Sequence, residues 1–271
     1  MRILIMCDME GVSGIVTWDQ VGGGKPGYPE GRELYTAEVN AAVRGASRAG
    51  ASEIIVIDGH NAGGDWRYNS LIKGMLDPAC EYVAHHTWTD YRTPLEQGVD
   101  ACLMVGYHAR NNTPDGVLNH TISSAQCRNL WFNDELVGEV GVNAALCGHY
   151  GCPVLLVTGD VAVCREATAL LGKGLTTVAV KRGLSKYSAR QIAPQRAREM
   201  IEEGACQALG DLSAVVPYVP ASPVTITVEF GHFDTMAAYS PRSDVVLDQP
   251  AQKMYSRADD WMRAWDKIWP F

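Results

Sequence analysis

The sequence has no segment of the kind that enters a membrane or directs secretion. No run reaches the roughly 18 apolar residues that a membrane-spanning helix needs, and the first residues lack the regions of a secretory signal. Its eight cysteines include no CxxC pair, which argues against a zinc knuckle or a thioredoxin-type redox site. We therefore expect a soluble, cytoplasmic protein with reduced cysteines.

Positive charge is also scarce. Lys and Arg number 23 against 31 Asp and Glu, so the formal net charge is −8. The chain shows no basic cluster of the kind that binds nucleic acid. Because an acidic protein is repelled by DNA, RNA and anionic membrane surfaces, we expect no nucleic acid and no membrane among its partners.

Strand-like and helix-like segments alternate along most of the 271 residues. The strand-like runs are RILIMC (2–7), EIIVID (53–58), ACLMVG (101–106), PVLLVT (153–158) and LTTVAV (175–180). The helix-like segments are 31–49, 139–150, 160–171 and 194–209. This alternation predicts an α/β fold in which a largely parallel sheet is flanked by helices.

The pattern changes after about residue 182. A helix is followed by a proline-rich bend and by VTITVEF (224–230). The strict alternation of that run predicts a half-exposed antiparallel strand. We therefore predict a metal-binding catalytic α/β domain at 1–182 and a smaller α+β domain at 183–271.

Three shorter segments carry local signals. Residues 130–137 are typical of a hairpin that turns at Asn133-Asp134. The glycine-rich stretch GGGK (22–25) lacks the full phosphate-loop motif, so we interpret it as a flexible surface loop. Near the C-terminus, helical spacing predicts a helix packed on the core or on another subunit. The residues with that spacing are Met254, Trp261, Trp265 and Ile268.

Metal-binding residue types recur directly after three strand-like runs. Asp8 and Glu10 follow the first run, His60 the second and His108 the third. The carboxyl ends of parallel strands meet at one edge of a sheet, where the chemistry of α/β proteins collects. Asp8 and Glu10 would repel each other unless a cation lies between them or one holds a proton. The coincidence of three runs therefore predicts a metal site at this edge.

Two further residues are weaker candidates when each is taken alone. Glu139 lies at the predicted start of a helix, where the helix dipole by itself would favour an acid. His120 follows a long polar loop, and a surface histidine would be the simpler interpretation of its position.

Five stretches, taken in order, resemble the D-aminopeptidases encoded beside bacterial dipeptide transporters, a family of dinuclear zinc peptidases. They are CDMEGVSG (7–14), IDGHN (57–61), GYHAR (106–110), GVLNHTI (116–122) and VGEVGVNAALCGHYGCPVLLVTGD (137–160). The resemblance covers about the first two thirds of the chain and is weaker beyond. It implies a large ring-like homo-oligomer, with a decamer as the candidate assembly. The zinc ligands that it implies are Asp8, Glu10, His60, His108 and Glu139, and the catalytic histidine is His120.

The implied ligands suit two zinc ions per chain. A catalytic zinc commonly takes three protein ligands, so two ions need six bonds, and five residues supply six if Asp8 bridges. Glu10 and His60 would then complete one ion, and His108 and Glu139 the other. Two divalent ions, three carboxylates and one bridging hydroxide sum to zero charge. Gly11 would let the chain turn away without a side chain that crowds the ions.

The predicted activity is zinc-dependent removal of N-terminal residues, D-amino acids by the resemblance, from short peptides. A metal-bound hydroxide would attack the peptide bond, and His120 would stabilise charge or pass a proton to the leaving amine. A dinuclear amidase or phosphoesterase could use the same ligands, although only Arg110 offers a cation near a motif. The residues also allow a hydrolase that uses Cys7, Ser123 or Ser124 with His120, or a metal-binding module without catalytic activity.

Overall fold

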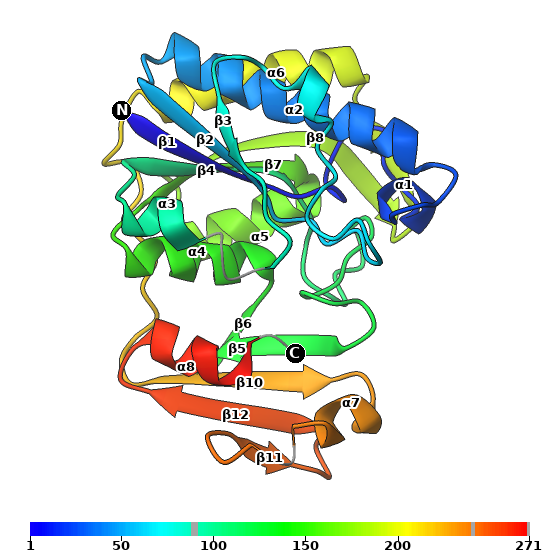
Figure 1. The fold of residues 1–271 in the computed structure, drawn as a ribbon, viewed down its shortest axis with the longest axis vertical. Helices are drawn as coiled ribbons and strands as arrows, with labels where there is room; N and C mark the ends of the chain where they lie inside the picture. The colour runs from blue at the N-terminus through cyan, green and yellow to red at the C-terminus, as the bar shows by residue number, and fades with distance from the viewer. Residues whose placement is uncertain (88–91, 240–241, 270–271) are drawn as a thin grey trace.

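The computed structural model describes residues 1–87, 92–239 and 242–269, and it contains two β-sheets (Figure 1). The larger sheet has seven strands in the order β3-β2-β1-β4-β7-β8-β9. Its neighbouring strands are parallel except for β8 and β9. The smaller sheet has five strands in the order β11-β12-β10-β5-β6, all paired antiparallel. The predicted α/β fold with a largely parallel sheet is therefore confirmed.

Helices cover both faces of the larger sheet. On one face lie α2 (Tyr28–Arg48) and α6 (Pro194–Ala208), which pack on each other, and on the other lie α4 (Glu139–His149) and α5 (Val161–Leu171) (Figure 1). Because both faces are covered, the central strands are buried along their length and read as continuous apolar runs. The strands of this sheet are β1 (Arg2–Cys7), β2 (Glu53–Asp58), β3 (Glu81–Val83), β4 (Ala101–Tyr107), β7 (Val154–Asp160), β8 (Thr176–Ser185) and β9 (Ser188–Gln191).

The smaller sheet contains the predicted hairpin. Strands β5 and β6 pair antiparallel, and Asn133 and Asp134 connect them. Asn133 has φ 53°, a left-handed conformation that asparagine tolerates better than most residues. The strands of this sheet are β5 (Cys127–Phe132), β6 (Glu135–Val137), β10 (Val224–Phe230), β11 (Val246–Asp248) and β12 (Lys253–Ala258).

The run VTITVEF forms β10 and is antiparallel, as predicted. It is more buried than the alternation suggested, because it lies in the middle of its sheet between β12 and β5. Even Thr227, on the polar side of the alternation, is only 8% exposed. Strand position in the sheet, which the sequence of one strand does not show, decides this burial.

The two sheets do not divide the chain at the predicted boundary between 182 and 183. Strand β8 runs through that point to Ser185, and β9 and α6 still belong to the larger sheet and its helical layer. The smaller sheet in turn takes β5 and β6 from the middle of the chain. Beyond Lys181, where β7 no longer pairs with it, β8 continues as a strand because β9 completes its hydrogen bonds.

The predicted C-terminal helix is α8 (Trp261–Ile268), while Met254 lies in β12 instead. Helix α8 packs on β10 and β12 and also contacts α4, so it lies between the smaller sheet and α4 (Figure 1). Its tryptophans stack in a row, with 5.4 Å between the ring centroids of Trp261 and Trp265 and of Trp265 and Trp269. The remaining short helices are α1 (Trp18–Val21), η1 (Lys73–Met75), α3 (Thr93–Glu96) and α7 (Phe233–Ala237).

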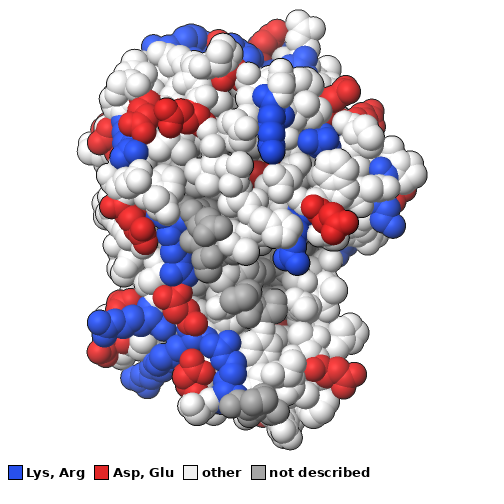
Figure 2. Space-filling model, viewed as in Figure 1, with Lys and Arg blue, Asp and Glu red and all other residues white. Residues whose placement is uncertain are grey.

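Acidic and basic side chains are interspersed over the face shown in Figure 2. Among the described residues, no helix combines the length and the apolar character needed to cross a membrane.

Candidate metal centre

Three neighbouring strands of the larger sheet deliver the first four candidate residues. Strands β2, β1 and β4 are adjacent and parallel, so their carboxyl ends lie along one edge. Asp8 and Glu10 come after β1, His60 comes two residues after β2, and His108 follows β4 directly. All four side chains are buried, with 1–6% of each residue exposed. The structure thus brings them together where the sequence predicted.

Close backbone contact holds the ends of β1 and β4 together. The amide of Gly11 donates to the carbonyl of Gly106 at 2.7 Å. A Cβ on Gly11 would overlap the carbonyl oxygen of Tyr107, and a Cβ on Gly106, which has φ +78°, would overlap the carbonyl oxygen of Asp8. Gly11 is therefore required by the neighbouring strand, a different reason from the crowding of ions expected from the sequence.

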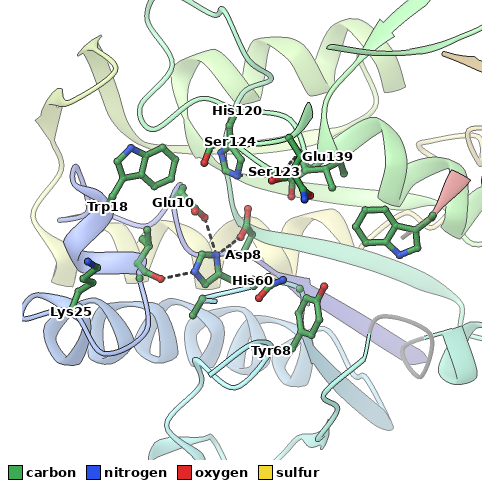
Figure 3. A pocket seen from close by; sticks show the side chains of 18 of the residues that line it. Asp8, Glu10, Trp18, Lys25, His60, Tyr68, His120, Ser123, Ser124 and Glu139 are labelled. Atoms are coloured by element: carbon green, nitrogen blue, oxygen red, sulfur yellow. Dashed lines mark hydrogen bonds and ion pairs between the residues drawn. The ribbon is translucent and has the colours of Figure 1, made fainter. Parts of the chain in front are cut away.

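His60 faces both carboxylates that follow β1. Its Nδ1 lies 3.2 Å from Asp8 Oδ1 and 3.1 Å from Glu10 Oε2 (Figure 3). Its Nε2 lies 2.8 Å from the carbonyl of Val21, which holds the ring in place from the other side. Such a carbonyl partner is typical of a metal-binding histidine, because it fixes the ring and leaves the other nitrogen for the ion.

A second group of side chains surrounds His108. Its Nε2 lies 3.1 Å from Glu139 Oε1 and 3.4 Å from Asp8 Oδ2, while its Nδ1 lies 3.0 Å from the carbonyl of Ala109. The ring of His120 stacks on that of His108 with centroids 3.9 Å apart, and His120 Nε2 lies 3.6 Å from Glu139 Oε1. Glu139 and His120, the two weaker candidates from sequence, therefore join the same cluster.

The electrostatics of this cluster call for a cation. Burial, and then the charge of Glu10, raise the pKa of Asp8 to about 7. Burial lowers the pKa of His60 and His108, but the charges and hydrogen bonds of the surrounding carboxylates together outweigh it and raise both pKa values well above the ordinary value; Glu10 contributes most for His60 and Glu139 for His108. Without a metal, the protein would have to retain protons on these groups to offset the buried negative charge.

Several ligating atoms in the cluster have no hydrogen bond within the described structure although they are buried. They are Asp8 Oδ2, Glu10 Oε2 and His108 Nε2. Buried polar atoms without a partner are costly, and a bound ion is one of the few things that satisfies them together. The ligating atoms of Asp8, Glu10 and His108 lie within 4.8 Å of one another, as do those of His108, His120 and Glu139. The residues present fit metal binding.

The cluster lies at one side of a cavity of about 430 Å³ (Figure 3). This volume is within the usual range of small-molecule sites. Its other walls include side chains that the sequence did not place at the site: Trp18, Lys25, Tyr68, Trp265 and Trp269. Helix α8 thus packs on the core, as predicted, and lines the cavity as well. Lys25 belongs to the stretch interpreted as a flexible surface loop, which the structure shows as a hydrogen-bonded turn against the cavity.

Lys181 of β8 is a further residue that sequence reasoning missed. Its buried Nζ donates to the carbonyls of Glu10, Val12 and Ile15 at 2.6–2.9 Å. Three charge-assisted hydrogen bonds hold the loop after β1 in one conformation. No local signal marks this lysine, because its partners are about 170 residues away in the chain.

The residues named for alternative chemistries have other partners. Arg110 pairs with Glu166, with 3.4 Å between Nη1 and Oε2, and does not line the cavity. Burial raises the pKa of the Cys7 thiol well above its ordinary value, and its Sγ lies 3.1 Å from the carbonyl of Ile57. Ser123 and Ser124 do line the cavity. On the imidazole ring of His120, Nδ1 lies 3.0 Å from the carbonyl of Leu118.

Comparison with known proteins identifies a class of hydrolase. The family model Peptidase M55, described as D-aminopeptidase, matches residues 1–268. The chain is also 32% identical over 238 residues to a D-aminopeptidase of Bacillus subtilis (strain 168), covering 86% of this chain and 82% of that one. The chain belongs to the D-aminopeptidase family, so the predicted family and the predicted class of enzyme, an aminopeptidase, are confirmed.

A solved structure agrees with this placement. It is described as the Zn-dependent D-aminopeptidase DppA from Bacillus subtilis, a self-compartmentalizing protease. The match has a TM-score of 0.89 at 28% sequence identity and covers 99% of this chain and 95% of that one. The arrangement of both sheets is therefore that of a known D-aminopeptidase.

Proposed function

We propose that this protein holds two zinc ions per chain and uses them to remove N-terminal D-amino acids from short peptides. Three buried ligating atoms without hydrogen bonds, on Asp8, Glu10 and His108, carry the proposal. A solved relative described as Zn-dependent supports the choice of metal. Glu10, His60 and Asp8 would hold one ion, and Asp8, His108 and Glu139 the other. When bound, zinc supplies Lewis acidity that lowers the pKa of water and polarises the scissile carbonyl.

His120 is proposed to move a proton during the reaction. The carbonyl of Leu118 lies 3.0 Å from Nδ1, so Nδ1 carries the hydrogen and Nε2 is the nitrogen left with a lone pair. His120 is among the residues that line the cavity. Nε2 can therefore accept a proton from the attacking water and return it to the nitrogen of the leaving amine. Trp18, whose ring meets that of His120 edge-on at 5.4 Å, restricts the histidine's orientation.

The substrate is proposed to need a free amino terminus. Asp8, Glu10 and Glu139 place three carboxylates around one side of the cavity, which favours a cationic or metal-coordinating amine over an acylated one. The preference for a D-residue is supported by the family and by both relatives. Handedness depends on which cavity wall the first side chain meets, and Tyr68, Trp18 and Trp265 form candidate walls.

A single set of assays tests this assignment. The rates of cleavage of D-Ala-D-Ala, L-Ala-L-Ala, Gly-Gly and N-acetyl-D-Ala-D-Ala are compared under one condition with the zinc-loaded protein. We expect D-Ala-D-Ala to be cleaved fastest and the acetylated peptide to be resistant. Faster cleavage of the L-peptide would refute the D-preference alone. Cleavage of the acetylated peptide as fast as that of free D-Ala-D-Ala would contradict an aminopeptidase and indicate a general amidase.

We also propose a homo-oligomeric state, with a decamer as the candidate assembly. The description of the solved relative as self-compartmentalizing supports an assembly of several copies. Light scattering coupled to size-exclusion chromatography measures the mass directly, and a mass near that of one 29.5 kDa chain would contradict the proposal. The cytoplasmic location stays a prediction from the sequence.

A further inference from the structure

The cavity beside the metal centre is charged unevenly. Among the described residues that line it, the acids are Asp8, Glu10 and Glu139, and Lys25 is the one lysine or arginine. Lys25 lies on the same side as Trp18 in the view of Figure 3, whereas Tyr68 lies beyond His60. A small molecule that filled this cavity would meet the metal centre on one side and one positively charged side chain, that of Lys25, elsewhere on the wall.

The position of Lys25 is set by the backbone. Its amide donates to the carbonyl of Gly22 at 3.1 Å, which closes a turn in which Gly24 has φ +77°. A positive φ at this third position is what a type II turn requires, and glycine adopts it without strain. The amide of Gly23 donates to the carbonyl of Ala62 at 2.8 Å, which attaches the turn to the segment after His60. Lys25 is therefore anchored to the wall of the site.

The ammonium group of Lys25 is available to a ligand. The side chain is exposed, and within the described parts of the chain Nζ takes part in no ion pair and no hydrogen bond. Elsewhere many charged side chains of this protein are paired, as Arg165 is with Asp115 at 2.8 Å. A fixed turn that presents one unpaired cation to a substrate cavity is typical of a group that binds an anion.

We propose that Lys25 binds the C-terminal carboxylate of the peptide and so makes the enzyme selective for short peptides with a free C-terminus. This inference rests on the proposed function. In a free dipeptide the carboxylate and the amine lie at opposite ends of a chain that spans about 7 Å when extended. With the scissile bond at the metal centre, the C-terminal residue lies along the cavity wall and its carboxylate meets the ammonium group of Lys25. Lys25 takes no part in the bond-breaking step and acts on binding.

A second lysine provides a matched control. Lys186 also lies near this region, with its Nζ 5.9 Å from the centre of the Trp18 ring. It is not among the residues that line the cavity. Lys186→Met removes the same charge from the neighbourhood of Trp18 without removing a wall residue, so it separates a direct contact from a general change in electrostatic potential.

The test compares two substrates, D-Ala-D-Ala and its C-terminal amide, on the zinc-loaded wild type, Lys25→Met, Lys25→Arg and Lys186→Met. For the wild type we expect a KM for the free acid about tenfold below that for the amide, because only the free acid can accept a charge-assisted hydrogen bond from Lys25. We expect Lys25→Met to raise the KM for the free acid about tenfold, to leave the KM for the amide unchanged and to keep kcat within about twofold on both. Lys25→Arg should keep most of the preference, and Lys186→Met all of it.

Other outcomes overturn the inference and are distinguishable from failure of the proposed function. A wild type without preference for the free acid, a Lys25→Met variant that retains the preference, or an equal loss in Lys186→Met would each show that Lys25 does not bind the carboxylate. If both substrates are still cleaved in those cases, the proposed aminopeptidase activity is not contradicted. A wild type that cleaves neither peptide would remove the proposed function and this inference with it. Zinc content and melting temperature, measured for every variant, confirm that only binding has changed.

Discussion

In the larger sheet, the neighbouring strands β1, β2 and β4 end at the candidate metal centre, and Asp8, His60 and His108 follow those strand ends by one or two residues. The smaller sheet reaches the same site indirectly. Glu139 follows β6 by two residues and begins α4, and Trp265 comes from α8, which packs between this sheet and α4. The parallel sheet thus positions the inner candidate ligands by its topology, while the antiparallel sheet closes the site from outside through the elements attached to it.

This difference has a physical origin. In a parallel sheet all strands point one way, so residues just past neighbouring strand ends are close in space whatever separates them in sequence. Antiparallel strands alternate in direction and place successive ends at opposite edges. Only a particular connection, such as Gly138 between β6 and α4, then brings a side chain to a chosen point. Substitutions in the larger sheet, in the smaller sheet and in the loop between them therefore test this difference.

The largest effect is expected for His108→Ala, which removes a proposed zinc ligand at the end of β4. We expect the variant to retain less zinc than about two ions per chain and to lose at least about a hundredfold in kcat/KM, because transition-state stabilisation by the metal is lost. Elemental analysis and peptide cleavage measure both. His149→Ala, at the exposed end of α4, is the matched control and should behave as the wild type. Active enzyme with only trace metal would refute the dinuclear site.

His120→Ala tests whether the loop between the two sheets supplies chemistry or a ligand. We expect kcat to fall about a hundredfold or more, because a group that moves a proton is lost. Zinc content should stay that of the wild type. The ligating atom of His120 lies within 4.8 Å of those of His108 and Glu139, so a variant that loses one zinc ion would identify His120 as a ligand instead. Unchanged turnover would exclude both roles.

Trp265→Ala disturbs the smaller sheet. The side chain is 2% exposed and stacks between Trp261 and Trp269, so its removal leaves a large cavity under α8. We expect the free energy of unfolding to fall by about 3–5 kcal/mol. Urea denaturation followed by circular dichroism gives this value. Trp131→Ala on the half-buried face of β5 is the control and should cost clearly less. Equal losses would show that α8 does not depend on this packing.

Gly11→Ala disturbs the contact between β1 and β4. The new methyl group would overlap the carbonyl oxygen of Tyr107, so the two strand ends must separate. Overpacking of this kind costs about 1–3 kcal/mol, and the shift should also weaken zinc retention. Gly74→Ala, where a Cβ has no atom within 4 Å, should be nearly neutral. Calorimetric melting of both variants makes the comparison, and a stable Gly11→Ala would show that the strand ends can yield.

Much of the larger sheet could be predicted from local sequence. The runs 2–7 and 53–58 are strands with those bounds, and the predicted helix 139–150 is observed as Glu139–His149. Buried parallel strands read as continuous apolar runs and helices as periodic ones, so both carry their signal locally. The smaller sheet was less predictable. It combines distant parts of the chain, because β5 and β10 are neighbours in space but lie almost a hundred residues apart.

The sequence by itself determined the α/β fold, the order of the metal-binding residue types and, through motif resemblance, the family. Tertiary structure alone decided what surrounds the reaction. Lys181 supports the loop after β1 from 171 residues away, and Trp265 and Lys25 line one cavity although they come from opposite ends of the chain. Their positions depend on how strands pair and layers pack, and no local pattern records that because the contacting residues share no stretch of sequence.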